Sequence, residues 1–259
     1  MRKLAVLLSL QVLLGKFSFP KRHRKVNKNL KLTNKKTKKI IEMATISGKT
    51  NYGLIDYCRK QLGKPYWWGT SGQMATKALL TSLRKLYKSQ YEKPMYGNAE
   101  SQLGVKVHDC MGLIEGFFWS ETPESEAKYN SNGFNDTTAD RLLASATEKG
   151  DIASIPEIPG LSVHFKGHVG VYEGNGMVIE ARGHEFGVVR TKLKERPWTA
   201  WAKIPQLEYQ TPQQAVTDIT EKKKRKTAKT ILLWTSVISG VALLTFGAIK
   251  AYKYWKNGD

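Results

Sequence analysis

The sequence predicts an α+β domain in which several helices precede an antiparallel sheet. The first observation is the order of two patterns: apolar residues recur at helical spacing before residue 150 and alternate with a period of two after residue 160. The second is the turn Gly174-Asn175-Gly176, which lies between two alternating runs and joins them as a hairpin. Hairpin-linked strands are antiparallel, and helices segregated from such a sheet define the α+β class.

Four stretches predict the helices. The first ends at Gly63-Lys64-Pro65, a sequence that stops a helix, and the second is followed by a polar loop that continues to His108. The third is mostly apolar, and the fourth ends near Lys149-Gly150. In chain order these stretches are Tyr52–Leu62, Gln73–Lys88, Cys110–Trp119 and Thr138–Thr147.

Five short runs predict the strands, because each combines apolar residues with a period near two. In chain order they are Leu161–Phe165, Val169–Glu173, Met177–Ala181, Gly187–Thr191 and Trp198–Ile204. Together with the four helices they place the folded domain at residues 46–209. No internal repeat is evident.

The ends of the chain carry its net charge of +20. Residues 46–209 hold 20 Lys and Arg against 18 Asp and Glu, whereas the two flanks together hold 22 against 4. A basic groove for nucleic acid is therefore not expected in the domain, and we expect no specific nucleic-acid partner. The basic flanks are instead suited to anionic lipid or another anionic polymer.

The N-terminal flank has two parts. Residues 1–15 join a basic start to an apolar run, which is typical of a signal peptide or of a short membrane-touching helix. The following residues lack the small side chains of a cleavage site, so a non-native leader before a start at Met43 also fits. Residues 16–45 form a basic tail that is predicted to be disordered and either binds an anionic surface or is simply solvated.

The C-terminal flank predicts a membrane anchor. Residues 210–229 are a basic linker, and no residue from Ile231 to Ile249 is charged. A helix of that length spans roughly 28 Å, close to the thickness of the hydrocarbon core. We therefore predict a transmembrane helix at residues 230–250, followed by a short tail at 251–259. Aromatic residues near its ends suit the membrane interfaces; they are Trp234, Tyr252, Tyr254 and Trp255.

Cys110 and His168 are the candidate catalytic pair. Cys110 opens an apolar helical run, and the N–H groups of a helix N-terminus lower the pKa of a thiol by favouring the thiolate. His168 opens the strand-like run Val169–Tyr172 and could act as general base toward Cys110 and then as general acid toward a leaving amine. Each residue alone is more often structural, so the combination carries the prediction. Cys58 is expected to be a buried apolar residue.

Glu180 is the candidate for orienting the far nitrogen of His168. In a hairpin with the three-residue loop 174–176, residue 173 pairs with 177, so Glu180 lies opposite Gly170 and diagonal to His168 on the same face. A two-residue Asn-Gly turn would put Glu180 on the opposite face, so the longer loop is expected. The alternative is a solvent-facing residue on an edge strand.

No metal and no cofactor are expected. His108, His164 and Cys58 are potential ligands, but the sequence lacks the Cys-x-x-Cys or His-x-x-x-His spacing of a zinc site.

These residues resemble the NlpC/P60 family of papain-like cell-wall cysteine peptidases, in the variant of Gram-positive bacteria and their phages. Three blocks carry the resemblance, in the family's order: Pro-Tyr-x-x-Gly within Gly63–Thr70, Asp-Cys-x-Gly within Asp109–Ile114, and His-Val-Gly-x-Tyr within Gly167–Tyr172. Val178–Gly183 follows at the family's spacing, and the resemblance covers roughly residues 50–205.

The resemblance implies a papain-like α+β fold in which the cysteine lies at a helix N-terminus facing the sheet. It implies cleavage of peptide bonds in peptidoglycan stem peptides. It also implies that Tyr66 and Asp109 bind substrate, with Tyr66 beside the nucleophile, where it shapes the oxyanion site.

Three departures from the family pattern are present. Met111 replaces the usual Ser after the nucleophile, and Glu180 stands where His, Asn or Gln is usual. A carboxylate can still orient an imidazole and favours its protonated form. The stretch Ser71–Val107 is longer than is usual between the tyrosine and cysteine blocks, so it is either a lid that narrows specificity or a helical insertion.

The sequence therefore predicts a membrane-tethered peptidoglycan hydrolase that cleaves amide bonds through an acyl-enzyme on Cys110. Met111 and Glu180 keep an alternative open, a catalytically silent domain of the same fold that binds wall peptide. A thiol acyltransferase is a further alternative. The partners expected are stem peptides, the membrane through the C-terminal helix, and anionic lipid or wall polymer through the basic tails.

The location expected is the cell membrane, with a single span and an extracellular domain. The charges beside the span oppose this orientation, because six basic residues at 222–229 precede it and three at 250–256 follow it. An N-terminal signal would override that bias, since long domains translocate largely regardless of charge. The alternative is a phage protein that waits inside the cell until the membrane is breached.

Overall fold

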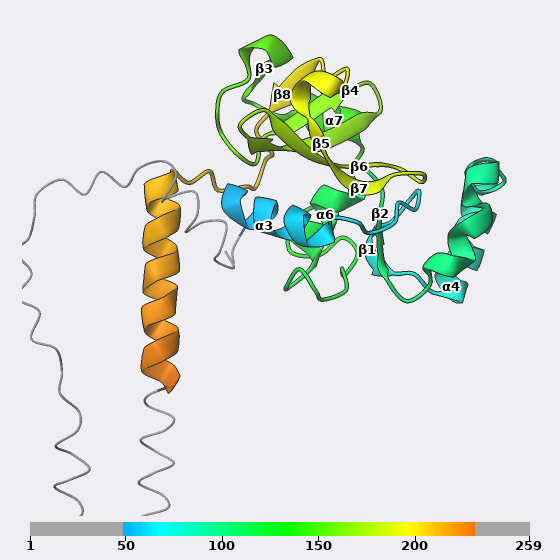
Figure 1. Cartoon of the computed structure of the whole chain (residues 1–259), viewed down its shortest axis with the longest axis horizontal. Helices are drawn as coiled ribbons and strands as arrows, with labels where there is room; N and C mark the ends of the chain where they lie inside the picture. Colours follow the sequence, from blue (N-terminus) through cyan, green and yellow to red (C-terminus); the bar gives the residue numbers. More distant parts are fainter. Residues whose placement is uncertain (1–48, 231–259) are drawn as a thin grey trace, which may run out of the picture. The chain divides into compact units, whose positions relative to one another are not determined.

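A six-stranded antiparallel sheet forms the centre of residues 49–230, the part of the chain that the structure, a computed structural model, describes (Figure 1). Its strand order is β3-β8-β4-β5-β6-β7. This sheet confirms the predicted α+β class and the five predicted strands, whereas the short polar strand β3 was not predicted. The bounds are β3 Lys149–Asp151, β4 Ser162–Phe165, β5 His168–Gly174, β6 Met177–Gly183, β7 Gly187–Lys192 and β8 Ala200–Ala202.

Two helices, α3 (Asn51–Gln61) and α6 (Gly112–Trp119), lie side by side against the sheet (Figure 1). The side chain of Thr50 caps α3 by accepting a hydrogen bond of 3.0 Å from the Gly53 N–H. Both helices were predicted, with ends that differ by one or two residues.

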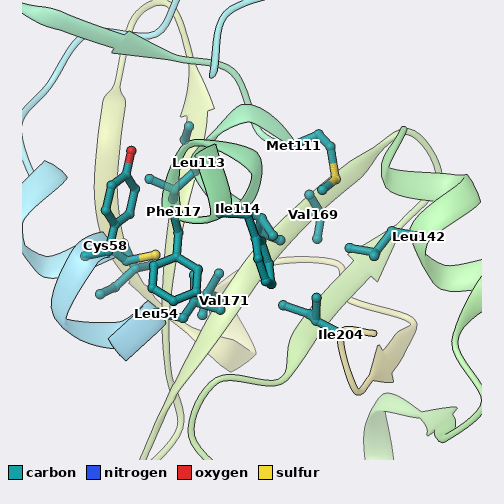
Figure 2. Close-up of a cluster of buried hydrophobic side chains, with 14 of the residues drawn as sticks. Leu54, Cys58, Met111, Leu113, Ile114, Phe117, Leu142, Val169, Val171 and Ile204 are labelled. Atoms are coloured by element: carbon teal, nitrogen blue, oxygen red, sulfur yellow. The ribbon is translucent and has the colours of Figure 1, made fainter. Parts of the chain in front are cut away.

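The main hydrophobic core fills the space between these helices and β5 (Figure 2). Cys58 belongs to this core and is fully buried, as predicted, and both cysteines are free thiols. Met111 also packs here with 5% of its surface exposed, so its side chain is a core residue and not a replacement for a substrate-contacting Ser. Other members are Leu54, Leu113, Ile114, Phe117, Val169 and Val171.

A second apolar cluster covers the opposite face of the sheet. Tyr172 and Trp198 belong to it, together with Leu161, Val163, Val178 and Trp201. Strand β5, which begins at His168, is therefore buried on both faces and along its whole length.

The stretch 71–107 is folded around a small hydrophobic cluster of its own. The predicted helix Gln73–Lys88 is wrong at its start, because Gln73 and Met74 pair with Val107 and Lys106 in a two-stranded sheet. The helix begins only after Thr76, whose side chain accepts a hydrogen bond from the Leu79 N–H. The elements are β1 Ser71–Met74, α4 Lys77–Leu86, α5 Lys88–Tyr91, the 3₁₀ helix η1 Pro94–Gln102 and β2 Lys106–His108.

The remaining elements are short, apart from the last helix. Helix α7 (Ala139–Ser145) confirms the prediction, and η2 (Ile152–Ser154) and η3 (Leu193–Glu195) are single 3₁₀ turns. The segment predicted as a basic linker is helical from 212 to 230, and its Ala215 is buried against Tyr52. Across residues 49–230, no helix combines the length and the apolar character that a bilayer crossing requires. The predictions for residues 1–45 and for the apolar run 231–249 concern residues outside this range.

Candidate active site

Cys110 lies in a turn immediately before α6, which begins at Gly112. The Asp109 carboxylate fixes this turn, because one oxygen accepts a hydrogen bond from the Gly112 N–H (2.7 Å) and the other accepts one from the Gly69 N–H (2.9 Å). Asp109 thus acts as a helix cap. The helix starts two residues later than predicted, and both Asp109 oxygens, which the family resemblance assigns to substrate, are bound to the protein's own backbone.

Helix α6 approaches the backbone of Thr70 and Ser71 so closely that only glycine fits. A Cβ atom on Gly112 would lie 1.9 Å from the Thr70 carbonyl oxygen, and one on Gly116 would lie 2.9 Å from the Ser71 carbonyl oxygen. The glycine of the Asp-Cys-x-Gly block therefore determines how deeply Cys110 is set.

The thiol of Cys110 is largely enclosed. Burial, together with the negative charge of Asp109, raises the pKa of the Cys110 thiol to about 12, although the N–H groups of Val169 and Met111 act in the opposite direction. The expectation that the helix N-terminus lowers this pKa is therefore wrong, because the sulfur loses more solvation than the N–H groups compensate. An enclosed thiol of this kind needs a base to become a nucleophile.

The register of the β5–β6 hairpin is the one predicted, but it arises differently. Val171 pairs with Ile179 and Tyr172 with Val178, which places Glu180 opposite Gly170. The turn has only two residues between the paired Gly174 and Met177, and a bulge between 172 and 174 restores the register. The expected three-residue loop is therefore wrong, because the bulge supplies the extra residue on β5.

His168 and Glu180 are hydrogen-bonded, as predicted. Nε2 of His168 lies 2.7 Å from Oε2 of Glu180, and the carboxylate is fully buried. Burial alone would raise the pKa of Glu180, but hydrogen bonds from His168, Thr191 and Arg196 bring it below its ordinary value. Glu180 is thus a carboxylate acceptor, so Nε2 carries the proton and Nδ1 is the nitrogen left for Cys110.

The Cys110 thiol lies beside the backbone next to His168 and is not in contact with the imidazole through a hydrogen bond. The thiol interacts with the N–H of Val169, the residue that follows His168. Among residues 49–230 no hydrogen bond joins the Cys110 thiol to the imidazole. Catalytic hydrogen bonds are often loose in the absence of substrate and tighten when it binds.

Three residues that the sequence analysis missed enclose His168. Its ring stacks on Phe165 (centroids 4.8 Å apart) and on Trp198 (5.6 Å), and Arg196 binds Glu180 behind it. Phe165 directly opposes His168 across the β4–β5 pair, so the alternation of β4 could have identified it. Arg196 and Trp198 follow η3 in an irregular segment, where no periodicity predicts which way a side chain points.

Tyr66 lies near the nucleophile, as the family resemblance implies. Burial and the nearby charges of Asp109 and Cys110 raise the pKa of its hydroxyl above the ordinary value. Tyr66 therefore keeps its proton and is a hydrogen-bond donor toward negative charge that forms on a bound substrate.

The stretch 71–107 reaches the same region. Nε2 of His184, in the β6–β7 turn, lies 2.7 Å from Oδ1 of Asn98, and its ring packs on Tyr96 with centroids 4.2 Å apart. Nδ1 of His184 lies 2.9 Å from the Tyr66 carbonyl oxygen. His184 therefore ties the insertion to the tyrosine block, which places it close enough to the candidate site for a lid.

A buried carboxyl group, that of Glu115, lies on α6, five residues after Cys110. Oε2 of Glu115 accepts a hydrogen bond of 2.8 Å from the Ser71 hydroxyl, and Oε1 accepts one of 3.0 Å from the Thr137 N–H. Burial is the main reason that the pKa of Glu115 rises from 4.5 to about 8. The unfolded chain loses this proton at lower pH than the folded protein does. The contribution of Glu115 to stability is therefore complete below pH 4.5 and lost as pH rises toward 8.

Replacing Glu115 with Gln is expected to flatten this pH dependence. The amide keeps the Thr137 contact and has no charge to bury, so the variant gains stability over the parent at pH 8 by on the order of 3 kcal/mol and gains little at pH 4. Urea unfolding at several pH values measures both. Equal pH profiles for variant and parent would show that Glu115 is not the group that titrates.

No group of three or more potential metal ligands occurs within residues 49–230. His108 is fully buried with Nε2 3.1 Å from the Tyr57 hydroxyl, and His164 lies with Nε2 2.9 Å from the Ser162 hydroxyl. Both imidazoles are enclosed in the fold and lie on different elements.

Comparison with known proteins gives matches among solved structures. No protein-family model matches the chain, and no curated protein matches it. NlpC2 from Trichomonas vaginalis is 18% identical over 62% of this chain and has a TM-score of 0.38; the match spans 49% of that protein. The chain thus spans about half the length of that relative.

Two further matches carry the word peptidoglycan in their descriptions. The NlpC/p60 domain of the peptidoglycan hydrolase SagA is 15% identical over 60% of this chain and 99% of that domain, with a TM-score of 0.35. The peptidoglycan hydrolase RipB from Mycobacterium tuberculosis is 19% identical over 68% of this chain and 69% of that protein, with a TM-score of 0.35. The descriptions of NlpC2 and of the SagA domain carry the name of the family that the sequence blocks resemble.

Proposed function

We propose that the chain is a cysteine peptidase that cleaves amide bonds in peptidoglycan stem peptides. The observation that carries the proposal is the buried hydrogen bond of 2.7 Å between His168 and Glu180, on a strand whose next residue contacts the Cys110 thiol. A nucleophile, a base and a group that orients the base are the three parts that thiol catalysis requires. The substrate class rests on the three sequence blocks that resemble the NlpC/P60 family.

In the proposed reaction, Nδ1 of His168 takes the thiol proton while the Cys110 sulfur attacks the carbonyl carbon of the scissile amide. The new C–S bond gives a tetrahedral intermediate, whose oxyanion the Tyr66 hydroxyl stabilises. The C–N bond then breaks, and the imidazolium returns the proton to the leaving amine. Water, deprotonated by the same imidazole, hydrolyses the thioester and releases the acid and the free thiol.

Glu180 has two effects in this scheme. Its oxygen holds the proton on Nε2, which keeps Nδ1 free to accept the thiol proton, and the hydrogen bond fixes the orientation of the imidazole. Because the Cys110 pKa is raised by burial, proton transfer to His168 is the step that makes the thiol reactive.

The proposal includes a membrane tether through residues 230–250 and an extracellular domain. It rests on the uncharged run 231–249 and on the location of the substrate outside the membrane. Protease added to intact cells is expected to cut the domain. A domain that survives on intact cells and is cut only after lysis would place it in the cytoplasm.

A second candidate function is a wall-peptide-binding domain that does not cut. Two observations favour it: the pKa of the Cys110 thiol is raised, and no hydrogen bond joins this thiol to His168 among the described residues. A domain that only binds peptide needs neither an ionised thiol nor a base bonded to it. The two functions differ in the products that they release from the cell wall.

Digestion of purified peptidoglycan by the full-length protein tests the proposal. New stem-peptide fragments, identified by mass spectrometry, are expected from the parent and from Cys58→Ala, and none from Cys110→Ala. Cys58 is the matched control, because it is a free cysteine in the core with no role in the site. Folded protein that releases no fragments from several wall types contradicts hydrolysis and favours the binding domain or an acyltransferase.

A further inference from the structure

Arg196 forms a bidentate ion pair with Glu180. Its Nε lies 3.0 Å from Oε1 and its Nη2 lies 3.2 Å from Oε2. The Glu180 side chain is fully buried, and the Arg196 side chain is only 17% exposed. A planar guanidinium that engages both oxygens of an enclosed carboxylate fixes the orientation of that carboxylate.

The ion pair also changes the charge that His168 experiences. An unpaired carboxylate in contact with Nε2 would favour the imidazolium and oppose its return to the neutral base. With Arg196 bound, Glu180 and Arg196 together carry no net charge, while the Glu180 oxygen still accepts the Nε2 proton. The family resemblance leads one to expect His, Asn or Gln at this position, and a neutral Asn or Gln would present an acceptor of the same kind.

Arg196 contacts the rings that hold the imidazole as well. The guanidinium carbon lies 5.4 Å from the Phe165 ring centroid and 5.9 Å from that of Trp198. These two rings stack on His168. Arg196 therefore lies beside both rings that stack on His168 as well as binding the carboxylate that accepts from it.

The other titratable groups near His168 do not neutralise the Glu180 carboxylate as Arg196 does. Cys110 approaches from the turn before α6, His164 from β4 and Asp140 from α7, where its carboxylate accepts a hydrogen bond of 2.8 Å from the Gly167 N–H. Burial lowers the pKa of His164 to about 4, so His164 is neutral at physiological pH. Within residues 49–230, Arg196 is the permanent cation paired with Glu180.

We propose that Arg196 is a positioning residue that turns Glu180 into a net-neutral acceptor and so keeps His168 able to act as a base. The inference rests on the proposed function, because it assigns His168 the role of base. It explains how a carboxylate can occupy a position at which the family resemblance leads one to expect His, Asn or Gln.

The experiment is a double-mutant cycle that removes the charges of Arg196 and Glu180 one at a time and together. It uses the full-length protein in the Cys110→Ala background, and NMR of labelled histidine follows the titration of His168. Arg196→Met leaves Glu180 unpaired and is expected to move the His168 titration midpoint up by about one pH unit. Glu180→Gln leaves Arg196 unpaired and is expected to move the midpoint down. The double variant removes both charges and is expected to return the midpoint to within a few tenths of a unit of the parent.

A midpoint that stays in place in Arg196→Met and in Glu180→Gln overturns the proposal. If Arg196→Met does not fold, the comparison of Glu180→Gln with the double variant decides, because only a charge effect predicts a downward shift that the second substitution reverses. The readout needs no substrate, so it is independent of whether the protein digests peptidoglycan. In proteins that keep Cys110, and where the parent digests peptidoglycan, the double variant is expected to digest it at least tenfold faster than Arg196→Met does.

Discussion

Replacing His168 with Ala is expected to lower the rate of stem-peptide release by about 10³-fold or more. The physical reason is the enclosure of the nucleophile. Burial raises the pKa of the Cys110 thiol to about 12, so at pH 7 the thiol is almost entirely protonated unless a base assists it. The imidazole supplies the base that compensates for this, and alanine supplies none. The measurement is the initial rate of fragment release per folded molecule, with the folded fraction taken from circular dichroism.

His164→Ala is the control for this substitution. It removes a buried imidazole from the neighbouring strand β4, where Nε2 of His164 lies 2.9 Å from the Ser162 hydroxyl. Any loss of stability from an emptied imidazole site is therefore common to both variants, whereas the loss of rate per folded molecule is expected only for His168→Ala. A His168→Ala protein that keeps more than a tenth of the parent rate would remove His168 from the mechanism.

Replacing Gly112 with Ala is expected to lower the free energy of unfolding by about 3 kcal/mol or more. The added Cβ would lie 1.9 Å from the Thr70 carbonyl oxygen and 2.8 Å from the Ser71 Cα, and both are backbone atoms that cannot rotate away. Either α6 or the chain at Thr70 must move. Cys110 precedes α6 directly, so the same shift displaces the nucleophile.

Gly97→Ala is the matched control, because a Cβ atom on Gly97 would meet no atom within 4 Å. Urea unfolding of both variants and the parent measures the effect, and Gly97→Ala is expected to unfold within about 0.5 kcal/mol of the parent. An unfolding midpoint for Gly112→Ala equal to that of Gly97→Ala would mean that α6 is less closely packed than the structure describes.

The elements predicted correctly from the sequence are those whose signal is local. Helical spacing that ends at Gly63 or near Gly150 predicts α3 and α7, and the turn Gly174-Asn175-Gly176 predicts the β5–β6 hairpin. The error at Gln73 and Met74 has a tertiary cause: these residues pair with β2, which lies about thirty residues further along the chain. Helical spacing in the sequence cannot reveal a partner strand at that distance.

The residues of the candidate site also fall into those that a local pattern indicates and those that only the fold brings together. Cys110, His168 and Glu180 stand at positions where a periodic pattern begins or where a hairpin register fixes the face, so the sequence indicates them as candidates. Arg196 lies in an irregular segment and is found only when the fold brings it to Glu180. The Cys110 pKa was predicted with the wrong sign because a helix N-terminus can be read from the sequence, whereas the burial of the sulfur cannot.

The bulge on β5 has a consequence for how the register of the hairpin is held. Glu173, the extra residue, is anchored by Arg59 of α3 and Arg190 of β7, each at 2.6 Å. If Glu173 entered the ladder while the two-residue turn stayed, every pair beyond it would shift by one residue, and Glu180 would lie on the opposite face of β6 from His168 although no residue was altered. The two ion pairs of Glu173 thus help to keep Glu180 beside His168 from another part of the hairpin.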